Sequence, residues 1–304
     1  MDPKTTGIIK IIFWSVLALF LFNLLFKNLY GYTHIPRLSS SEHFGKNKVS
    51  ENDFTDISEI EINWIDGEIT VGIYDGDTIN VSEYSKNPLS VKDMMQCKLS
   101  GDKLSIDYCS RKGFSFLFKP KNINKRLTVL IPKKLAQLNE LKIDTVSSLI
   151  DISEICTKNI NVETVSGPAS ISNVTLSDFS SSSVSGKIFA KSLTAQSINL
   201  DTVSGDCFIE GSVSLVDFDS TSGSLEFTSD ICPSEIKAAT ISGNVTAYIP
   251  EDSSFSYSFD RVSGNFNTDF SVVLSKGGGT CGNADSEFSF DTVSGDVMLK
   301  AGRP

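Results

Sequence analysis

The sequence predicts an all-β protein: a single-stranded, mostly parallel β-solenoid (β-helix) with about eight rungs of 18–21 residues, preceded by an N-terminal transmembrane helix. Three observations predict this architecture. A motif close to Thr-Val-Ser-Gly recurs through the second half, apolar residues recur at fixed distances from each copy, and a long apolar run lies near the start. A near-constant repeat is typical of a solenoid, whose stacked turns bury a core that no single turn could bury alone.

The first element is the apolar run at residues 8–26, which is long enough to cross a bilayer core of about 30 Å as a helix. Bulky residues follow it and no small-residue cleavage motif does, so we expect a short tail at 1–7 and an uncleaved transmembrane helix at 8–29. Residues 30–56 lack periodicity and predict a stalk. We expect a single-pass protein of the cell membrane with its solenoid domain extracellular, because the repeats are rich in Ser, Thr and Asn.

The remaining chain, residues 57–304, is expected to form one solenoid domain. Its first part, 57–135, predicts an irregular cap region with strands near 60–64 and 127–131 and a hairpin around Gly101. Residues 136–304 predict the regular repeats. The fourth motif position falls at Ser148, Gly167, Gly186, Gly205, Gly223, Gly243, Gly264 and Gly295. The longer spacing before the last copy indicates a loop insertion near 271–286, which is a candidate binding element.

Apolar side chains occupy the same positions in nearly every repeat. Seven residues before the motif's last position stand Leu141, Ile160, Phe179, Ile198, Val216, Ile236, Tyr257 and Phe288. The positions five before and two after are similarly apolar, and so is the motif's own Val position. We therefore expect each position to form a ladder of stacked side chains on rungs about 4.8 Å apart. The change of phase predicts a bend just before the Val position, and the Gly at the adjoining corner suits a positive φ or close backbone approach.

The repeated Thr-Val-Ser-Gly-Asp pattern, clearest at residues 202–206 and 292–296, resembles that of the bacterial putative-adhesin family of unknown function. The segment from Leu127 to Pro132 is also similar to that family. The resemblance covers roughly residues 57–304. It implies a single-stranded β-solenoid, often carried on membrane-anchored envelope proteins, and it implies no catalytic residues.

An acidic position lies four residues before the end of most motif copies. Its members include Asp201, Asp219, Asp260 and Asp291. A stacked column of carboxylates could bind Ca²⁺ or a polar ligand, although nothing here matches a known Ca²⁺-binding repeat. The alternative, which we favour, is that these side chains accept hydrogen bonds from turn amides.

A basic segment interrupts the otherwise acidic chain, whose net charge is −10. It contains eight cations and no Asp or Glu between residues 111 and 134, and Phe114, Phe116, Leu117 and Phe118 interrupt the cations. One interpretation is a contact with anionic lipid or an acidic envelope polymer; the other is a soluble cap over the open first rung. The candidate contact residues are Arg111, Lys112, Lys119, Lys121, Lys125 and Arg126.

The residue inventory excludes several kinds of chemistry from the solenoid. The two histidines, His34 and His43, precede it, so it holds no Ser-His-Asp or Cys-His centre and no Cys/His zinc motif. No phosphate-binding glycine loop precedes a helix, and the acidic charge disfavours nucleic acid. We expect no cofactor.

These observations favour a non-enzymatic, membrane-anchored module of the cell envelope, acting as an adhesin-like binding or scaffold protein. Its partners would be the membrane and an envelope polymer, a glycan or a protein ligand. One alternative is an accessory protein of envelope-stress sensing or complex assembly. A weaker alternative is a carbohydrate-active β-helix enzyme, since paired carboxylates can serve glycoside hydrolysis.

Overall fold

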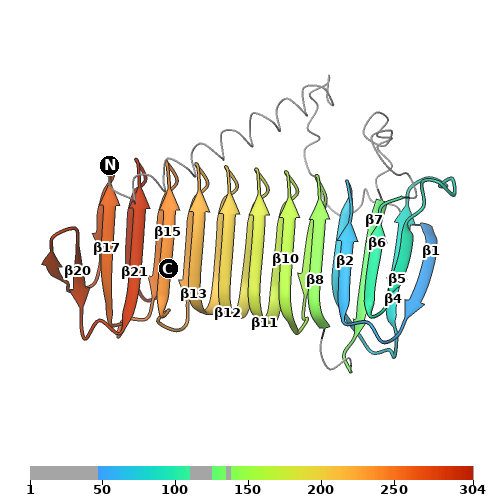
Figure 1. Cartoon of the computed structure of the whole chain (residues 1–304), viewed down its shortest axis with the longest axis horizontal. Helices are drawn as coiled ribbons and strands as arrows, with labels where there is room; N and C mark the ends of the chain where they lie inside the picture. Colours follow the sequence, from blue (N-terminus) through green and yellow to red (C-terminus); the bar gives the residue numbers. More distant parts are fainter. Residues whose placement is uncertain (1–46, 110–124, 135–137, 304) are drawn as a thin grey trace, which may run out of the picture.

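The computed structural model describes residues 47–109, 125–134 and 138–303. These residues form a 22-stranded, mostly parallel sheet that coils into a long stack of rungs (Figure 1). The chain is therefore all-β, as the repeat pattern predicts. Each rung has two sides. One side precedes the motif and the other follows it, and we call them the pre-motif and post-motif sheets.

The strands fall into four groups. The pre-motif sheet holds β6 (Lys103–Asp107), β2 (Glu59–Asn63), β8 (Leu138–Thr145), β10 (Thr157–Thr164), β15 (Glu235–Thr240), β21 (Ser286–Thr292) and β17 (Phe255–Arg261). The post-motif sheet holds β7 (Lys125–Pro132), β3 (Glu68–Tyr74), β9 (Leu149–Ser153), β14 (Leu225–Ser229), β16 (Val245–Ile249), β22 (Val297–Ala301) and β18 (Phe266–Thr268). Three long strands cross both sheets: β11 (Ala169–Ser183), β12 (Ile188–Thr202) and β13 (Cys207–Ser220). The caps contain β1 (Asn47–Phe54), β4 (Ile79–Ser85), β5 (Gln96–Ser100), β19 (Val273–Ser275) and β20 (Gly278–Cys281).

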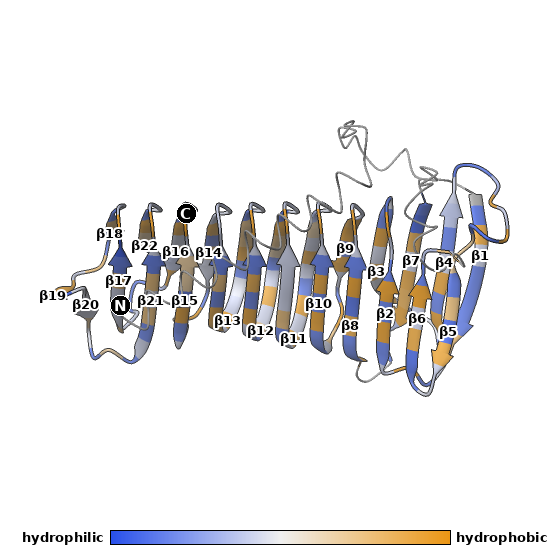
Figure 2. Ribbon diagram, turned by 45° about the horizontal axis from the view of Figure 1, so that its top comes forward, coloured by the Kyte–Doolittle hydropathy of each residue, from blue (hydrophilic) through white to orange (hydrophobic). Residues whose placement is uncertain are grey.

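The predicted ladders are present in the middle of the stack. Ile160 pairs in register with Phe179, and Phe179 pairs with Ile198. All three side chains are buried, and polar and apolar residues alternate along the strands (Figure 2). Burying such a side chain contributes about 1.5–3 kcal/mol, so the column of like residues stabilises the stack.

Rung order departs from chain order at both ends of the stack. The last rung, β21 and β22, lies between β15/β16 and β17/β18 (Figure 1). At the other end, β2 and β3 lie between β6/β7 and β8/β9. Equivalent residues still meet in register, but the outermost rungs come from the interior of the chain.

The motif bends at a different point from the one that the sequence predicts. In the second copy Thr164 is buried, whereas Val165 is only partly buried. The chain therefore bends at Val165 and Ser166, after the Thr, and not before the Val as predicted. A polar Thr can be buried here because its Oγ1 accepts a hydrogen bond of 2.9 Å from the amide of Gly167. The motif Ser donates its hydroxyl to a carbonyl of the preceding rung, as from Ser204 to Val184 at 3.1 Å.

The motif glycines stack closely on one another. A Cβ added to Gly205 would lie 2.2 Å from the carbonyl oxygen of Gly186, and one added to Gly243 would lie 1.9 Å from that of Gly223. Real side chains do not approach so closely, so the repeat requires glycine for backbone contact. Gly264 alone among the described motif glycines has a positive φ, of 113°.

Both ends of the stack differ from the predicted domain organisation. Residues 47–54, placed within the 30–56 stalk, form β1 and pair antiparallel with β4. The region 57–135 is not wholly irregular, because β2, β3, β6 and β7 belong to the stack. The insertion near 271–286 is not a simple loop either: β19 and β20 form an antiparallel hairpin that pairs with β17. Such caps cover sheet edges that would otherwise attract other chains.

The predicted tail, transmembrane helix and first part of the stalk lie outside the described residues. Within residues 47–109, 125–134 and 138–303, no helix has the length and apolar character needed to cross a membrane.

Candidate functional site

A long groove follows the corner where the pre-motif sheet ends. Its volume is about 730 Å³, and its lining residues come from six successive motif copies. At a rung spacing of about 4.8 Å, its length is roughly 24 Å. The partly buried motif residues, such as Val184 and Val203, supply apolar surface, and the acidic position supplies charge. The charged lining residues are Asp144, Glu163, Asp201 and Asp219.

The carboxylates at the two ends of the groove differ in their partners. At the N-terminal end, Lys142 Nζ lies 3.3 Å from both Asp144 and Glu163. Further along, Asp201 pairs in register with Asp219 on the next rung. Among the described residues, these two carboxylates have no ion-pair partner, and no turn amide donates to them. The prediction that this column caps the turns is therefore wrong for them, because Thr202 Oγ1 accepts from the Gly205 amide instead.

The environment of Asp219 favours its protonated form. Burial, followed by the neighbouring charges of Asp217, Asp201 and Asp291, raises the pKa of this carboxyl to about 6. Burial also raises the pKa of Asp201, with a smaller contribution from Asp217. The centre of the groove is thus an uncompensated negative site, which would be stabilised by a positively charged ligand.

We expect Asp219→Asn to stabilise the protein at pH 8 and to leave its melting temperature unchanged at pH 4. Between the unfolded pKa of about 3.9 and the folded pKa of about 6, the native state retains a proton that the unfolded chain has lost. The stabilising contribution of this group is therefore complete below pH 4 and is lost as pH rises through 6. Thermal melts from pH 4 to 8 measure it, with Asp260→Asn as an exposed control. A variant that melts below its parent at pH 8 would contradict the assignment.

The carboxylate column does not form a compact cation site in the part of the chain that the structure describes. No group of three or more His, Cys, Asp or Glu residues there is placed to hold a metal ion. The column is also interrupted and reordered: Ala239 lies between Asp219 and Asp291, and Asp260 follows Asp291.

The predicted basic cluster is only partly described. Arg111, Lys112, Lys119 and Lys121 lie outside the described residues. Arg126 is half-buried, with its guanidinium 4.5 Å from the centre of the Tyr84 ring. Lys125 was predicted to contact an anionic surface, and this is wrong because its side chain is completely buried.

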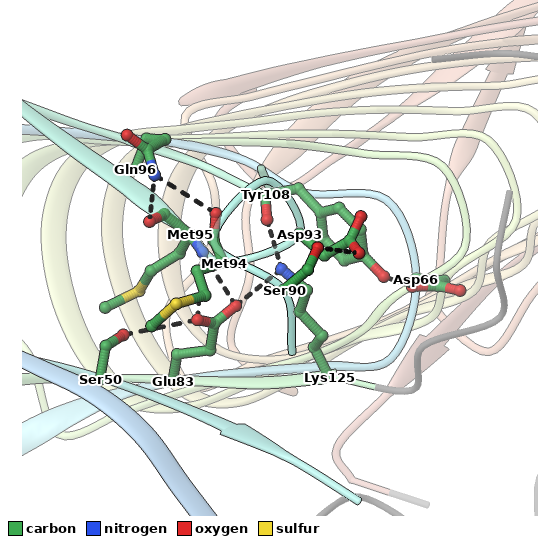
Figure 3. Close-up of polar contacts among 10 residues, drawn as sticks. All are labelled: Ser50, Asp66, Glu83, Ser90, Asp93, Met94, Met95, Gln96, Tyr108 and Lys125. Carbon is green, nitrogen blue, oxygen red and sulfur yellow. Dashed lines mark hydrogen bonds and ion pairs between the residues drawn. The ribbon is translucent and has the colours of Figure 1, made fainter. Parts of the chain in front are cut away.

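Lys125 is instead the centre of a buried polar network in the N-terminal cap (Figure 3). Its Nζ lies 2.7 Å from Glu83 Oε1 and donates to the carbonyl of Tyr108 at 2.5 Å. It also lies 4.1 Å from the centre of the Tyr108 ring. Glu83 accepts from the Met95 amide at 3.0 Å. Burial lowers the pKa of Lys125, but the Glu83 carboxylate opposes that shift. The hydrogen bonds of Lys125 link β7 to Glu83 on β4 and to Tyr108 in the segment after β6.

The acidic column follows from the sequence, but two other features, one in the groove and one in the N-terminal cap, do not. The motif Val positions line the groove instead of the core, and Glu83 neutralises Lys125 from 42 residues away. The alternation of Thr with the preceding apolar positions could have revealed the first feature. Nothing local to Lys125 indicates the second.

Comparison with known proteins identifies a family and several solved structures. The family model described as "Toastrack DUF4097" matches residues 57–300. One similar structure is a "Putative lipid binding protein" from Parabacteroides distasonis, with 15% identity over 84% of this chain and 94% of that chain and a TM-score of 0.48. A "putative adhesin" from Bacteroides fragilis has 16% identity over 84% and 98%, with a TM-score of 0.44. A "putative cell adhesion protein" from Clostridium sporogenes has 9% identity over 84% and 100%, with a TM-score of 0.26. No curated protein matches the chain.

Proposed function

Because the chain belongs to the Toastrack DUF4097 family, whose model covers most of its solenoid, we propose that it is a non-enzymatic, adhesin-like binding module of the cell envelope. The groove across successive motif copies carries this proposal. It is long, open along its length, and combines apolar surface with the unpaired carboxylates of Asp201 and Asp219. Such a surface suits an elongated ligand that carries positive charges along an apolar backbone.

The groove proposal predicts salt-sensitive binding of an extended cationic probe. Dye-labelled decalysine should bind the full-length protein in detergent, and the double substitution Asp201→Asn/Asp219→Asn should weaken binding about tenfold, equivalent to about 1.4 kcal/mol. Fluorescence anisotropy at low and moderate salt measures both effects. Asp260→Asn is the matched control, because Asp260 does not line the groove. Equal binding by the double variant and its parent would refute the proposal.

We further propose that residues 8–29 anchor the protein and that its solenoid faces outward. Support comes from the apolar run at 8–26 and from the polar character of the repeats. Protease shaving of intact cells tests the orientation: repeats that remain protected until lysis would place the domain on the inner side.

The basic segment supports a second contact, with an anionic surface beside the membrane. Each cation near such a surface contributes about 1 kcal/mol. Charge reversal of Lys119, Lys121 and Arg126 should therefore reduce salt-sensitive flotation with phosphatidylserine vesicles. Unchanged flotation would remove this contact from the proposal. Lys125 is left unaltered, because it is buried.

A further inference from the structure

A second surface, on the opposite side of the rungs from the groove, departs from its polar surroundings. The outward positions of the post-motif sheet are mostly hydroxyl-bearing or charged, but Phe189 and Phe208 occupy equivalent positions on neighbouring strands β12 and β13. Phe189 remains 44% exposed although it is a large apolar residue. A contiguous exposed apolar surface, unlike a single exposed side chain, marks a candidate binding site.

The two aromatic rings form one flat unit. Their centroids lie 5.1 Å apart and their planes differ by only 5°. On the other side of Phe189, its partner in register on β11 is Ser170, which is too small to cover an aromatic ring. The unit therefore keeps an open end toward β11. Aromatic faces carry a partial negative charge and attract C–H groups that are polarised by neighbouring oxygens.

Polar groups surround the rings inside a shallow cavity of about 610 Å³. Its charged members are balanced in sign: Lys191 and Arg303 against Glu210 and Glu226. Against β13 the register of β12 shifts between Ala190 and Leu193, so Lys191 lies at a bulge there, although it still pairs with Ser172 on β11. Bulges often lie next to sites, where they redirect a side chain.

We propose that the Phe189–Phe208 unit and its polar border form a binding site for a pyranose oligosaccharide. A sugar ring presents an apolar C–H face that fits a flat aromatic surface, and hydroxyl groups at its edge that both carboxylates and cations can bind. The balanced charges favour an uncharged, polyhydroxylated ligand over a nucleic acid, which the net charge of −10 would repel. The cavity is within the range of small-molecule sites. This inference rests on the proposed binding function and adds a ligand class at a second position.

Saturation-transfer NMR on the full-length protein tests the proposal. The probes are uncharged tetrasaccharides of glucose and N-acetylglucosamine, with irradiation of aromatic protons. We expect at least one to bind, Phe189→Ala and Phe208→Ala to weaken it at least tenfold, and Phe189→Tyr to retain it within about twofold. No binding of any probe, or binding unaffected by both alanine variants, overturns the proposal.

Two further variants separate the site from general stability and from the groove. Ser170→Leu should cover the open end of the aromatic unit and abolish binding while both rings remain in place. Asp201→Asn/Asp219→Asn should leave sugar binding unchanged. If Ser170→Leu binds sugar as its parent does, the open end of the unit is not the site and the proposal fails. If decalysine binds the groove but no tetrasaccharide binds, this inference fails and the proposed function stands.

Discussion

Lys125→Met is expected to lower the free energy of unfolding by about 3–5 kcal/mol, since it leaves the Glu83 carboxylate buried without its cation. Both side chains of the pair are completely buried. Urea unfolding at pH 7 measures the loss. Trp64 fluorescence is a suitable signal, because Lys125 Nζ lies 5.3 Å from the centre of its ring. A Trp14→Phe background removes the second tryptophan.

The double variant Lys125→Met/Glu83→Gln is the matched control. Replacing both members of a buried ion pair by neutral groups is often close to neutral in stability. Glutamine also keeps an acceptor for the Met95 amide, which Glu83 binds at 3.0 Å. We therefore expect the double variant to recover most of the lost stability. If it is as unstable as Lys125→Met, the loss arises from packing around the lysine stem and the ion pair has little part in it.

Gly205→Ala is expected to cost about 1–3 kcal/mol, the usual range for an overpacked site. The new Cβ would lie 2.2 Å from the Gly186 carbonyl oxygen and 3.0 Å from Thr202 Oγ1. Neither atom can move freely, because one belongs to the neighbouring backbone and the other accepts from the Gly205 amide. Thermal and urea unfolding should show the same loss of stability.

Gly72→Ala provides the control for this prediction. Gly72 is also buried in a strand of the stack, but the nearest atom to an added Cβ is Ser153 Oγ at 3.5 Å, an ordinary contact. Alanine there should be neutral or slightly stabilising, by up to about 1 kcal/mol, because it restricts the unfolded chain. Comparable losses at both positions would show that close stacking is not the reason for glycine in the motif.

The middle of the stack could be predicted from sequence because equal spacing determines which residues become neighbours. Ile198 and Val216 stand seven residues before successive motif ends, and they pair in register. Rung order at the ends does not follow from the same pattern. Phe288 fits against any member of its column, so periodicity cannot show that it lies between Ile236 and Tyr257.

The candidate site was predictable only where it follows the repeat. The acidic column is periodic, and its positions were found directly. The motif Thr is buried and the motif Val lines the surface groove, the opposite of what hydropathy predicts. Burial of the Thr202 hydroxyl is favourable because it accepts a hydrogen bond from the amide of Gly205. The paired phenylalanines occur on two strands alone, and they carry no periodic signal.

The displaced last rung also determines when the protein can finish folding. Synthesis proceeds from the N-terminus, so β17 and β18 leave the ribosome before the strands that separate them from β15 and β16 exist. Until β21 and β22 are made, β17 and β18 either stay undocked or pair transiently with β15 and β16, which are not their native neighbours. The strands β21 and β22 therefore complete the inside of the stack. A chain that stops before Ser286 lacks this internal rung, so β17 and β18 lose the rung on which they pack.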